Sequence, residues 1–343
     1  MSIKRIYLIY FILLIPSLYF TLEERSFFDN FLHFNPLASA GNEKTFFETA
    51  RQLSKYFDIT NAYFFLTESK FFILSLTLIA NLSQKLVSLQ FPNMIIFNLI
   101  GSFLTLFLIK NKFKLNSSLL IELILVSVIL TYSLVLLRDI WIIFFILANY
   151  YLISKKKYFL GIITLILIFD LRFFSGLIQL LLISKFFLKR KSLLIFIVLL
   201  SSIILANYLQ LFQDFIFTYN KYRLKEIEEI SSSGLTALIS NFIPSYWAVR
   251  LTFLFSPVPT LFLKISSVYT FFVGIGSLIT FIWIHILTKL NFKKSFYFLF
   301  PVLIIAFTSA EVRHKIPYMI LVIVYYYGLE YRQANYISNS KLT

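Results

Sequence analysis

Long apolar runs alternate with short polar turns along most of this chain. A helix that crosses the hydrocarbon layer of a membrane needs about 20 consecutive apolar residues. Judged against that length, the pattern predicts an all-α protein with about ten membrane-spanning helices. The predicted spans are Ile6–Leu22, Pro92–Ile109, Ser117–Leu137, Ile140–Ser154, Tyr158–Phe169, Phe174–Leu188, Ser192–Phe212, Ser266–Leu287, Ser295–Ala310 and Ile316–Gly328.

Basic residues in the turns set the orientation of the predicted spans. Lysine and arginine in short loops remain on the cytoplasmic side of a membrane. The clusters are Lys110/Lys112/Lys114, Lys155–Lys157, Lys189–Lys191 and Lys289/Lys293/Lys294. Together with Lys4 and Arg5, they predict that both termini are cytoplasmic and that the acidic turns face outward.

One more apolar run, Phe71–Val87, conflicts with that orientation. If it crossed the membrane, every later lysine cluster would lie on the outer side. We therefore predict that it lies against the outer face, within a first outer loop over about 23–91. A second outer loop is predicted over about 213–265, and both loops contain amphipathic patterns typical of surface helices. The chain, 1–343, is thus predicted to be one transmembrane domain without a soluble domain.

Composition supports the membrane class and narrows the set of partners. Hydrophobic residues make up 59% of the chain and charged residues 14%, with a mean hydropathy of +0.82, which is typical of a polytopic membrane protein. The net charge is +16, but the basic residues lie at the ends of apolar runs, so nucleic acid is not a predicted partner. The chain has no cysteine and no glycine-rich nucleotide loop. No metal site or cofactor is predicted, although the use of a divalent cation stays open.

Two short outer turns carry charges that interrupt apolar sequence. Arg138 and Asp139 are the whole connection between two predicted spans, where a solvated turn would normally use Gly, Asn, Pro or Ser. Asp139 is a candidate general base with Arg138 as an anion-binding partner; the alternative is a self-neutralising pair at the bilayer edge. Asp170 and Arg172 follow the short run Tyr158–Phe169, and they are either substrate contacts in a cavity or a structural pair.

Further charged residues complete the set of candidates. Arg313, His314 and Lys315 precede the last predicted span, where three potential cations suit a phosphate; the alternative is contact with lipid headgroups. Glu43 lies at the start of an amphipathic helical pattern. It is a candidate functional carboxylate at the membrane surface; the alternative is a solvated carboxylate that the helix N-terminus favours. Glu122 lies near an inner span end, where we expect neighbouring lysines to neutralise it.

The order of these features resembles the C-type membrane glycosyltransferases (the GT-C fold), which use polyprenyl-phosphate-linked sugars. In that family an anchor helix is followed by a long outer loop that often begins with Asp-Glu, with an aromatic residue and an Ala shortly after. The matching run here is Asn42, Glu43, Phe46 and Ala50, so the leading Asp is replaced by Asn. Glu43 is therefore the matching carboxylate in this loop.

Later turns extend the resemblance. Asp139 matches a second acidic residue in the short outer turn between the third and fourth spans, and Arg172 matches a basic residue in the next outer turn. Arg313 and the Pro317 that follows it resemble the closing pattern of a basic turn before a Pro-containing span. The length of the chain and the position of Arg138 are also similar to O-antigen and exopolysaccharide polymerases.

The resemblance implies a reaction and a set of roles. Glu43 and Asp139 would be the catalytic carboxylates, and the substrate would be bound by Arg138, Asp170, Arg172, Arg313 and His314. The expected activity is transfer of a sugar or saccharide from a polyprenyl-(pyro)phosphate donor to a glycan, lipid or protein acceptor in cell-surface glycan assembly. The expected location is the bacterial inner membrane, among membrane lipids, with the active face outside. The alternatives are a flippase or transporter of lipid-linked saccharides and a non-catalytic subunit of an envelope complex.

Overall fold

The regular structure in the described part of the chain is helical. The computed structural model describes residues 5–23, 70–86, 91–134, 138–187, 241–242, 251–255, 274–308 and 312–330. No strand occurs among these residues, so the predicted all-α class is confirmed for them. The α-helices are α1 (Arg5–Glu23), α5 (Lys70–Leu86), α6 (Phe91–Phe107), α7 (Leu119–Ser133), α8 (Asp139–Ser154), α9 (Tyr158–Leu171), α10 (Phe173–Phe187), α15 (Ile279–Lys289), α16 (Phe292–Thr308) and α17 (Val312–Tyr325). Two short π-helical segments continue α6 and α17, namely η3 (Leu108–Lys112) and η4 (Tyr326–Glu330).

Charged turns mark the helix boundaries. The predicted span Ile140–Ser154 corresponds to α8, which begins one residue earlier, and Tyr158–Phe169 corresponds to α9, which ends two residues later. Between these helices Lys156 has a φ of 63°, a left-handed conformation that stops a helix. The predicted span Ser192–Phe212 and most of both outer loops lie outside the described residues.

One continuous helix in the described part of the chain is long and apolar enough to cross a membrane on its own. It is α6 continued by η3, whose segment Ile95–Lys112 has 18 residues and a mean hydropathy of 1.4. Other apolar helices are shorter, as α9 with 14 residues illustrates. Helix length therefore supports one membrane span among the described residues, and the total of about ten spans stays a prediction.

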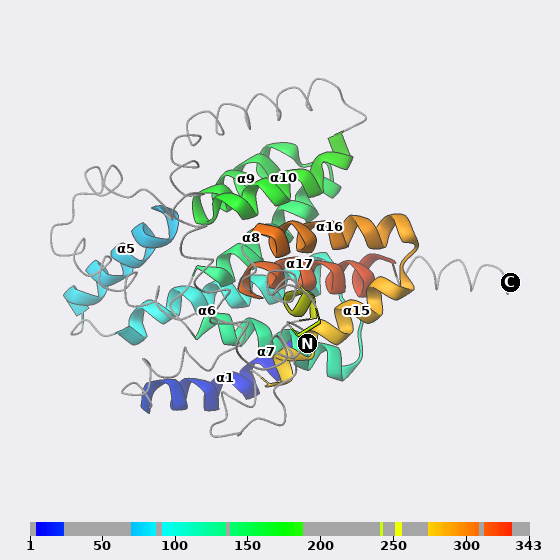
Figure 1. Cartoon of the computed structure of the whole chain (residues 1–343). Helices are drawn as coiled ribbons and strands as arrows, with labels where there is room; N and C mark the ends of the chain where they lie inside the picture. The colour runs from blue at the N-terminus through cyan, green and yellow to red at the C-terminus, as the bar shows by residue number, and fades with distance from the viewer. Residues whose placement is uncertain are drawn as a thin grey trace, which may run out of the picture.

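Consecutive helices from α6 to α10, and again from α15 to α17, run in alternating directions, so their ends gather at two opposite ends of a bundle (Figure 1). At one end, here called the Asp139 end, the start of α8 meets the end of α9 and the start of α17. Arg172 and Arg313 lie 2.7 and 3.9 Å from the Asp139 carboxylate there. At the other end, here called the Glu122 end, the starts of α1 and α7 meet, and Arg5 lies 2.7 Å from Glu122.

The described lysine-rich turns lie at the Glu122 end. The end of α17 is fixed there because the Asn116 amide donates to the Tyr327 carbonyl at 3.4 Å. Tyr325 contacts the rings of Tyr150 near the end of α8 and Phe298 near the start of α16, at 6.1 and 4.9 Å between centroids. The lysine clusters that follow α6 and α8 and precede α16 therefore share one end, as the predicted orientation requires.

α5 corresponds to the apolar run Phe71–Val87, and it stays at the Asp139 end. Its first two backbone amides donate to Asp170 at the end of α9. The early part of α6 lies at the same end, because Phe97 stacks on Trp141 of α8 at 4.4 Å. A 17-residue helix is about 25 Å long, whereas the connection through 87–90 reaches at most roughly 18 Å. A helix that ran to the Glu122 end could not return to the start of α6.

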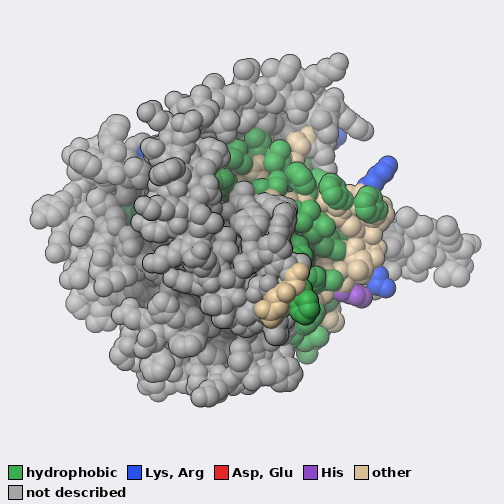
Figure 2. Space-filling view, viewed as in Figure 1, with side chains coloured by type: hydrophobic (Ala, Val, Ile, Leu, Met, Phe, Trp, Pro, Cys, Tyr) green, Lys and Arg blue, Asp and Glu red, His purple; other side chains and the backbone are tan. Residues whose placement is uncertain are grey.

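Large apolar side chains are exposed on the outside of the bundle. α6 and α16 each expose a stripe at a spacing of three or four residues, formed by Ile96, Ile100, Phe103, Phe107, Phe292, Phe296 and Phe300. Figure 2 shows apolar side chains gathered on the visible face of the described helices, with basic and histidine side chains at the right-hand edge. Exposed stripes of this size are typical of contact with lipid or with another protein.

Candidate functional site

A buried carboxylate lies between two arginines at the Asp139 end. Arg172 Nη2 donates to Asp139 Oδ1 at 2.7 Å, and Arg313 Nη1 lies 3.9 Å from Asp139 Oδ2. The side chain of Asp139 is 1% exposed, and those of Arg172 and Arg313 are 6% and 10% exposed. Three helix ends thus bring one anion and two cations into one buried cluster.

Each member of the cluster reaches it from a helix terminus. Asp139 is the first residue of α8, where the partial positive charge of the helix N-terminus favours a carboxylate. Arg172 lies between α9 and α10 with an extended backbone, φ −160° and ψ 107°. Arg313 is the second residue of α17. Because no member comes from the middle of a helix, the cluster lies near the end of the bundle.

Positive charge exceeds negative charge in this cluster. Arg138 precedes Asp139 and adds a third guanidinium whose charge acts on the carboxylate. Asp139 itself lies ahead of the predicted span Ile140–Ser154. Burial alone would raise the pKa of Asp139, but Arg172, Arg313 and Arg138 together outweigh burial and hold that pKa below its ordinary value. The carboxylate is therefore ionised at neutral pH, and the described cluster carries a surplus of cations.

Two buried polar atoms of the cluster have no hydrogen-bond partner among the described residues. They are Asp139 Oδ2 and Arg172 Nη1. A buried polar atom without a partner costs about 1–3 kcal/mol. The arrangement therefore suits an additional polar group, and the surplus positive charge favours an anion.

Asp170 contacts α5, not Arg172. Its Oδ1 accepts from the Lys70 amide at 3.1 Å and its Oδ2 accepts from the Phe71 amide at 2.9 Å. The alternative of a structural Asp170–Arg172 pair is wrong, because the chain leaves α9 between these residues and Arg172 binds Asp139 instead. In the structure Asp170 fixes the start of α5 against the end of α9. A role of Asp170 in substrate binding stays a prediction.

We expect Asp170→Ala to loosen the first turn of α5. Two helix amides, those of Lys70 and Phe71, lose their acceptor, so their hydrogen exchange should accelerate by about tenfold. Exchange measured by mass spectrometry on the full chain tests this. Asp170→Asn keeps one acceptor oxygen and should accelerate exchange less. Equal exchange in the wild type and the Ala variant would contradict the observed contact.

The structure brings together four of the predicted site residues, namely Arg138, Asp139, Arg172 and Arg313. His314 follows Arg313 on α17 and is half-buried. Glu43 lies outside the described residues, so its place in the site stays a prediction.

Lys315 was predicted to be the third cation of the phosphate site, but its ammonium group binds the segment 251–255 instead. It is fully buried, donates to the Phe253 carbonyl and, at 3.1 Å, to the Leu254 carbonyl, and lies over the Phe253 ring. Residues two apart on a helix point to opposite sides, which separates Lys315 from Arg313. This spacing is the signal that could have distinguished the two cations. Lys315 thus fastens the segment 251–255 to α17.

An aromatic cluster packs beside the start of α8. Trp141 stacks on Phe97 of α6 at 4.4 Å and meets the Phe71 ring of α5 edge-on at 5.7 Å. Gly101 makes room for the indole, because a Cβ there would lie 3.1 Å from the Trp141 ring. Trp141 lies two residues after Asp139, and its contacts join α5, α6 and α8. This packing fixes the position of the start of α8 and therefore of the Asp139 carboxylate.

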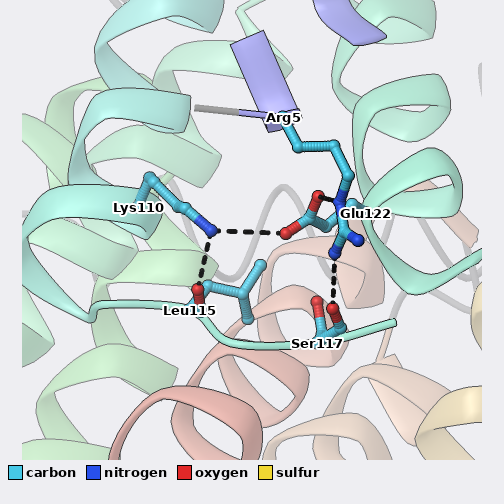
Figure 3. Close-up of polar contacts among 5 residues, drawn as sticks. All are labelled: Arg5, Lys110, Leu115, Ser117 and Glu122. Atoms are coloured by element: carbon cyan, nitrogen blue, oxygen red, sulfur yellow. Dashed lines mark hydrogen bonds and ion pairs between the residues drawn. The ribbon is translucent and has the colours of Figure 1, made fainter. Parts of the chain in front are cut away.

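Glu122, at the opposite end, differs from Asp139 because both of its oxygens have partners (Figure 3). Arg5 Nε lies 2.7 Å from Oε2, and Lys110 Nζ lies 3.3 Å from Oε1. The same cations donate to the carbonyls of Ser117 and Leu115. Neutralisation of Glu122 by a neighbouring lysine is confirmed. The group therefore ties α1, η3 and α7 together, and both carboxylate oxygens of Glu122 are paired with cations.

No group of three or more His, Asp or Glu residues in the described part of the chain could hold a metal ion. Comparison with known protein families, characterised proteins and solved structures finds no significant match to this chain.

Proposed function

We propose that this protein is a polytopic membrane glycosyltransferase that acts on the outer face of the bacterial inner membrane. It transfers a sugar or saccharide from a polyprenyl-(pyro)phosphate donor to an acceptor hydroxyl in cell-surface glycan assembly. The proposal is carried by the buried Asp139 with Arg172 and Arg313, at the end of the bundle opposite the lysine-rich turns. A carboxylate can accept a proton from the acceptor, and arginines can stabilise a departing phosphate.

Three features support the placement in a membrane. α6 with η3 is long enough to cross, apolar stripes cover the outside of α6 and α16, and the described lysine clusters share the Glu122 end. Lipid would cover the stripes, and the orientation rule would place the Glu122 end in the cytoplasm. In this arrangement about ten helices span the membrane, some of them short and tilted, and α5 lies against the outer face.

The reaction requires one proton acceptor and a set of cations. The acceptor oxygen forms a bond to the anomeric carbon of the sugar while the bond from that carbon to the phosphate oxygen breaks. The phosphate leaves with the electron pair, stabilised by Arg172 and Arg313, and the acceptor proton moves to the Asp139 carboxylate. Glu43 is the second candidate base. A polymerase of lipid-linked saccharides performs the same exchange with a longer donor, so it remains a variant of this proposal.

The distribution of buried charge favours a reaction site over a transport pathway. Among the described residues, the buried charged side chains belong to the two ends of the bundle, and they are Glu122, Asp139, Arg172, Arg313 and Lys315. In the interior, Gln179 donates to Asn149 at 2.8 Å, a contact that joins α10 to α8. A pathway for a charged substrate would instead place ionisable groups through the depth of the bundle.

We expect Arg313→Ala to weaken binding of a polyprenyl-phosphate sugar by about tenfold or more, and to affect this binding more than it lowers stability. Arg313 lies 3.9 Å from Asp139, and its loss leaves the hydrogen bond from Arg172 to Asp139 intact. Lys315→Met is the matched control, because this neighbour binds two carbonyls away from the cluster and should lower stability more than affinity. Unchanged donor affinity in Arg313→Ala would assign Arg313 to contact with lipid headgroups.

The function itself is tested by a transfer assay together with glycan analysis. The full chain in lipid nanodiscs would receive polyprenyl-phosphate donors with radiolabelled sugars, and transfer to glycan or lipid acceptors would be followed. In parallel, surface glycans of a deletion strain would be compared with those of the parent strain. We expect a missing or shortened glycan that the intact gene restores. Unchanged glycans together with transport of lipid-linked saccharide by the purified protein would replace the proposal with a transporter.

A further inference from the structure

The ion pair between Arg172 and Asp139 uses only part of the hydrogen-bonding capacity of Arg172. Arg172 donates to Asp139 through Nη2, whereas the buried Nη1 has no partner among the described residues. Arg313 Nη1 lies 3.9 Å from Asp139 Oδ2, which is too far for a hydrogen bond. A bidentate arginine–carboxylate pair would use two parallel bonds. The observed contacts are therefore weaker than the same groups could make with a better-matched anion.

We infer that a phosphate group competes with Asp139 for Arg172 and Arg313, and that phosphate binding releases the carboxylate. A phosphate offers more acceptor oxygens and more charge than a carboxylate, so it can bind Arg172 through both amino groups and also contact Arg313. This inference rests on the proposed function only for the expectation that the ligand carries phosphate. The ligand chemistry is that of a phosphate ester or diphosphate.

Exchange of the anion would couple donor binding to the activation of the base. In the structure the arginines stabilise the charged form of Asp139, which makes it a weak proton acceptor. Once phosphate neutralises the arginines, the carboxylate loses that stabilisation and accepts a proton more readily. Before the donor binds, the contacts of Asp139 with Arg172 and Arg313 give all three buried charges a partner of opposite sign.

The test is a comparison of phosphate affinity between the wild type and Asp139→Asn, measured on the full chain in phosphatidylcholine nanodiscs. The probes are inorganic pyrophosphate and polyprenyl phosphate. Because the internal competitor loses its charge, the variant should bind the probe about tenfold more tightly. Tighter binding of both probes by Asp139→Asn supports the exchange and shows that the phosphate group itself is recognised. Tighter binding of polyprenyl phosphate alone supports an exchange that requires a lipid phosphate. Equal or weaker binding of both probes would overturn the inference.

Glu122→Gln provides the matched control. Glu122 is also a 1% exposed carboxylate with two cationic neighbours, but it lies at the opposite end of the bundle and both of its oxygens have partners. Its neutralisation should leave the affinity for both probes within about twofold of the wild type. A gain as large as that of Asp139→Asn would mean that added net positive charge alone attracts phosphate, and would overturn the inference.

A loss of folding in Asp139→Asn would still be informative. The variant leaves the arginines with a weaker partner. A ligand that binds only the folded state stabilises that state more the tighter it binds at a given concentration. Pyrophosphate should therefore raise the thermal midpoint of Asp139→Asn more than that of the wild type, or restore folding when added during purification. The second variant, Asp139→Ser, should respond in the same way. No greater response in either variant would overturn the exchange.

The outcomes separate this inference from the proposed reaction. A gain of phosphate affinity without glycosyl transfer in the wild type would support the exchange and remove the proposed reaction. Transfer in the wild type without a gain in Asp139→Asn would leave the reaction in place and overturn the exchange.

Discussion

Asp139→Asn should abolish glycosyl transfer while the protein stays folded and inserted. The amide keeps an oxygen that can accept the hydrogen bond from Arg172, but it cannot take the proton of the acceptor hydroxyl. Loss of a general base typically lowers a rate by about 10²–10⁴-fold. The measurement is the initial rate at which a radiolabelled sugar leaves its polyprenyl-phosphate donor for the acceptor. The same variant is expected to bind phosphate more tightly, so binding and turnover should change in opposite directions.

The control for this result is the same chemical change at the other end of the bundle. Glu122→Gln also removes a buried carboxylate, but Glu122 ties helices together and takes no part in the proposed reaction. Its transfer rate per folded molecule should stay close to that of the wild type. If folded Asp139→Asn kept the wild-type rate, Asp139 would be removed as the base and Glu43 would become the leading carboxylate.

Arg172→Met should cause the largest loss of stability at this end of the bundle. It leaves Asp139 buried, with the hydrogen bond from Arg172 gone and with Arg313 3.9 Å away. Removing one partner of a buried ion pair typically costs about 3–5 kcal/mol, and Arg313 should keep the cost near the lower bound. The thermal midpoint in detergent should fall accordingly. Transfer should be lost as well, because the donor phosphate loses its main contact.

A double variant separates the two effects of Arg172. In Asp139→Asn/Arg172→Met no buried carboxylate is left uncompensated, so the thermal midpoint should recover much of the loss, while transfer should not return. A midpoint for Arg172→Met equal to that of the wild type would contradict the buried pair. A double variant no more stable than Arg172→Met would assign the loss to packing of the arginine side chain instead of charge.

Apolar periodicity and turn chemistry placed α8 and α9 closely, whereas α15 begins at Ile279 and not at the predicted Ser266. Charged dipeptides and lysine turns interrupt the apolar runs so sharply that the start of α8 and the end of α9 differ from the sequence-based boundaries by one or two residues. The same charges marked the candidate site, because an ionisable residue in an apolar chain needs a partner or a cavity. Asp139, Arg172 and Arg313 were therefore identifiable as functional candidates before their contacts were known.

The choice of partners could not be derived from the sequence. Asp170 and Arg172 are two residues apart and of opposite charge, which suggests a pair, yet Asp170 binds the start of α5 about a hundred positions earlier in the chain. Asp139 likewise binds Arg172 from the next turn instead of Arg138 beside it. Such pairings depend on which helices pack side by side, and helical periodicity carries no information about that.

Single-cysteine accessibility tests the division of the molecule into an outer Asp139 end and a cytoplasmic Glu122 end most directly. The chain has no cysteine, so Lys70→Cys at the start of α5 and Lys155→Cys after α8 each report alone. Intact cells would be treated with a maleimide that does not cross the inner membrane, before and after permeabilisation. We predict that position 70 is labelled from outside and that position 155 is labelled only after permeabilisation. Labelling of both positions from the same side would contradict the proposed outer reaction site.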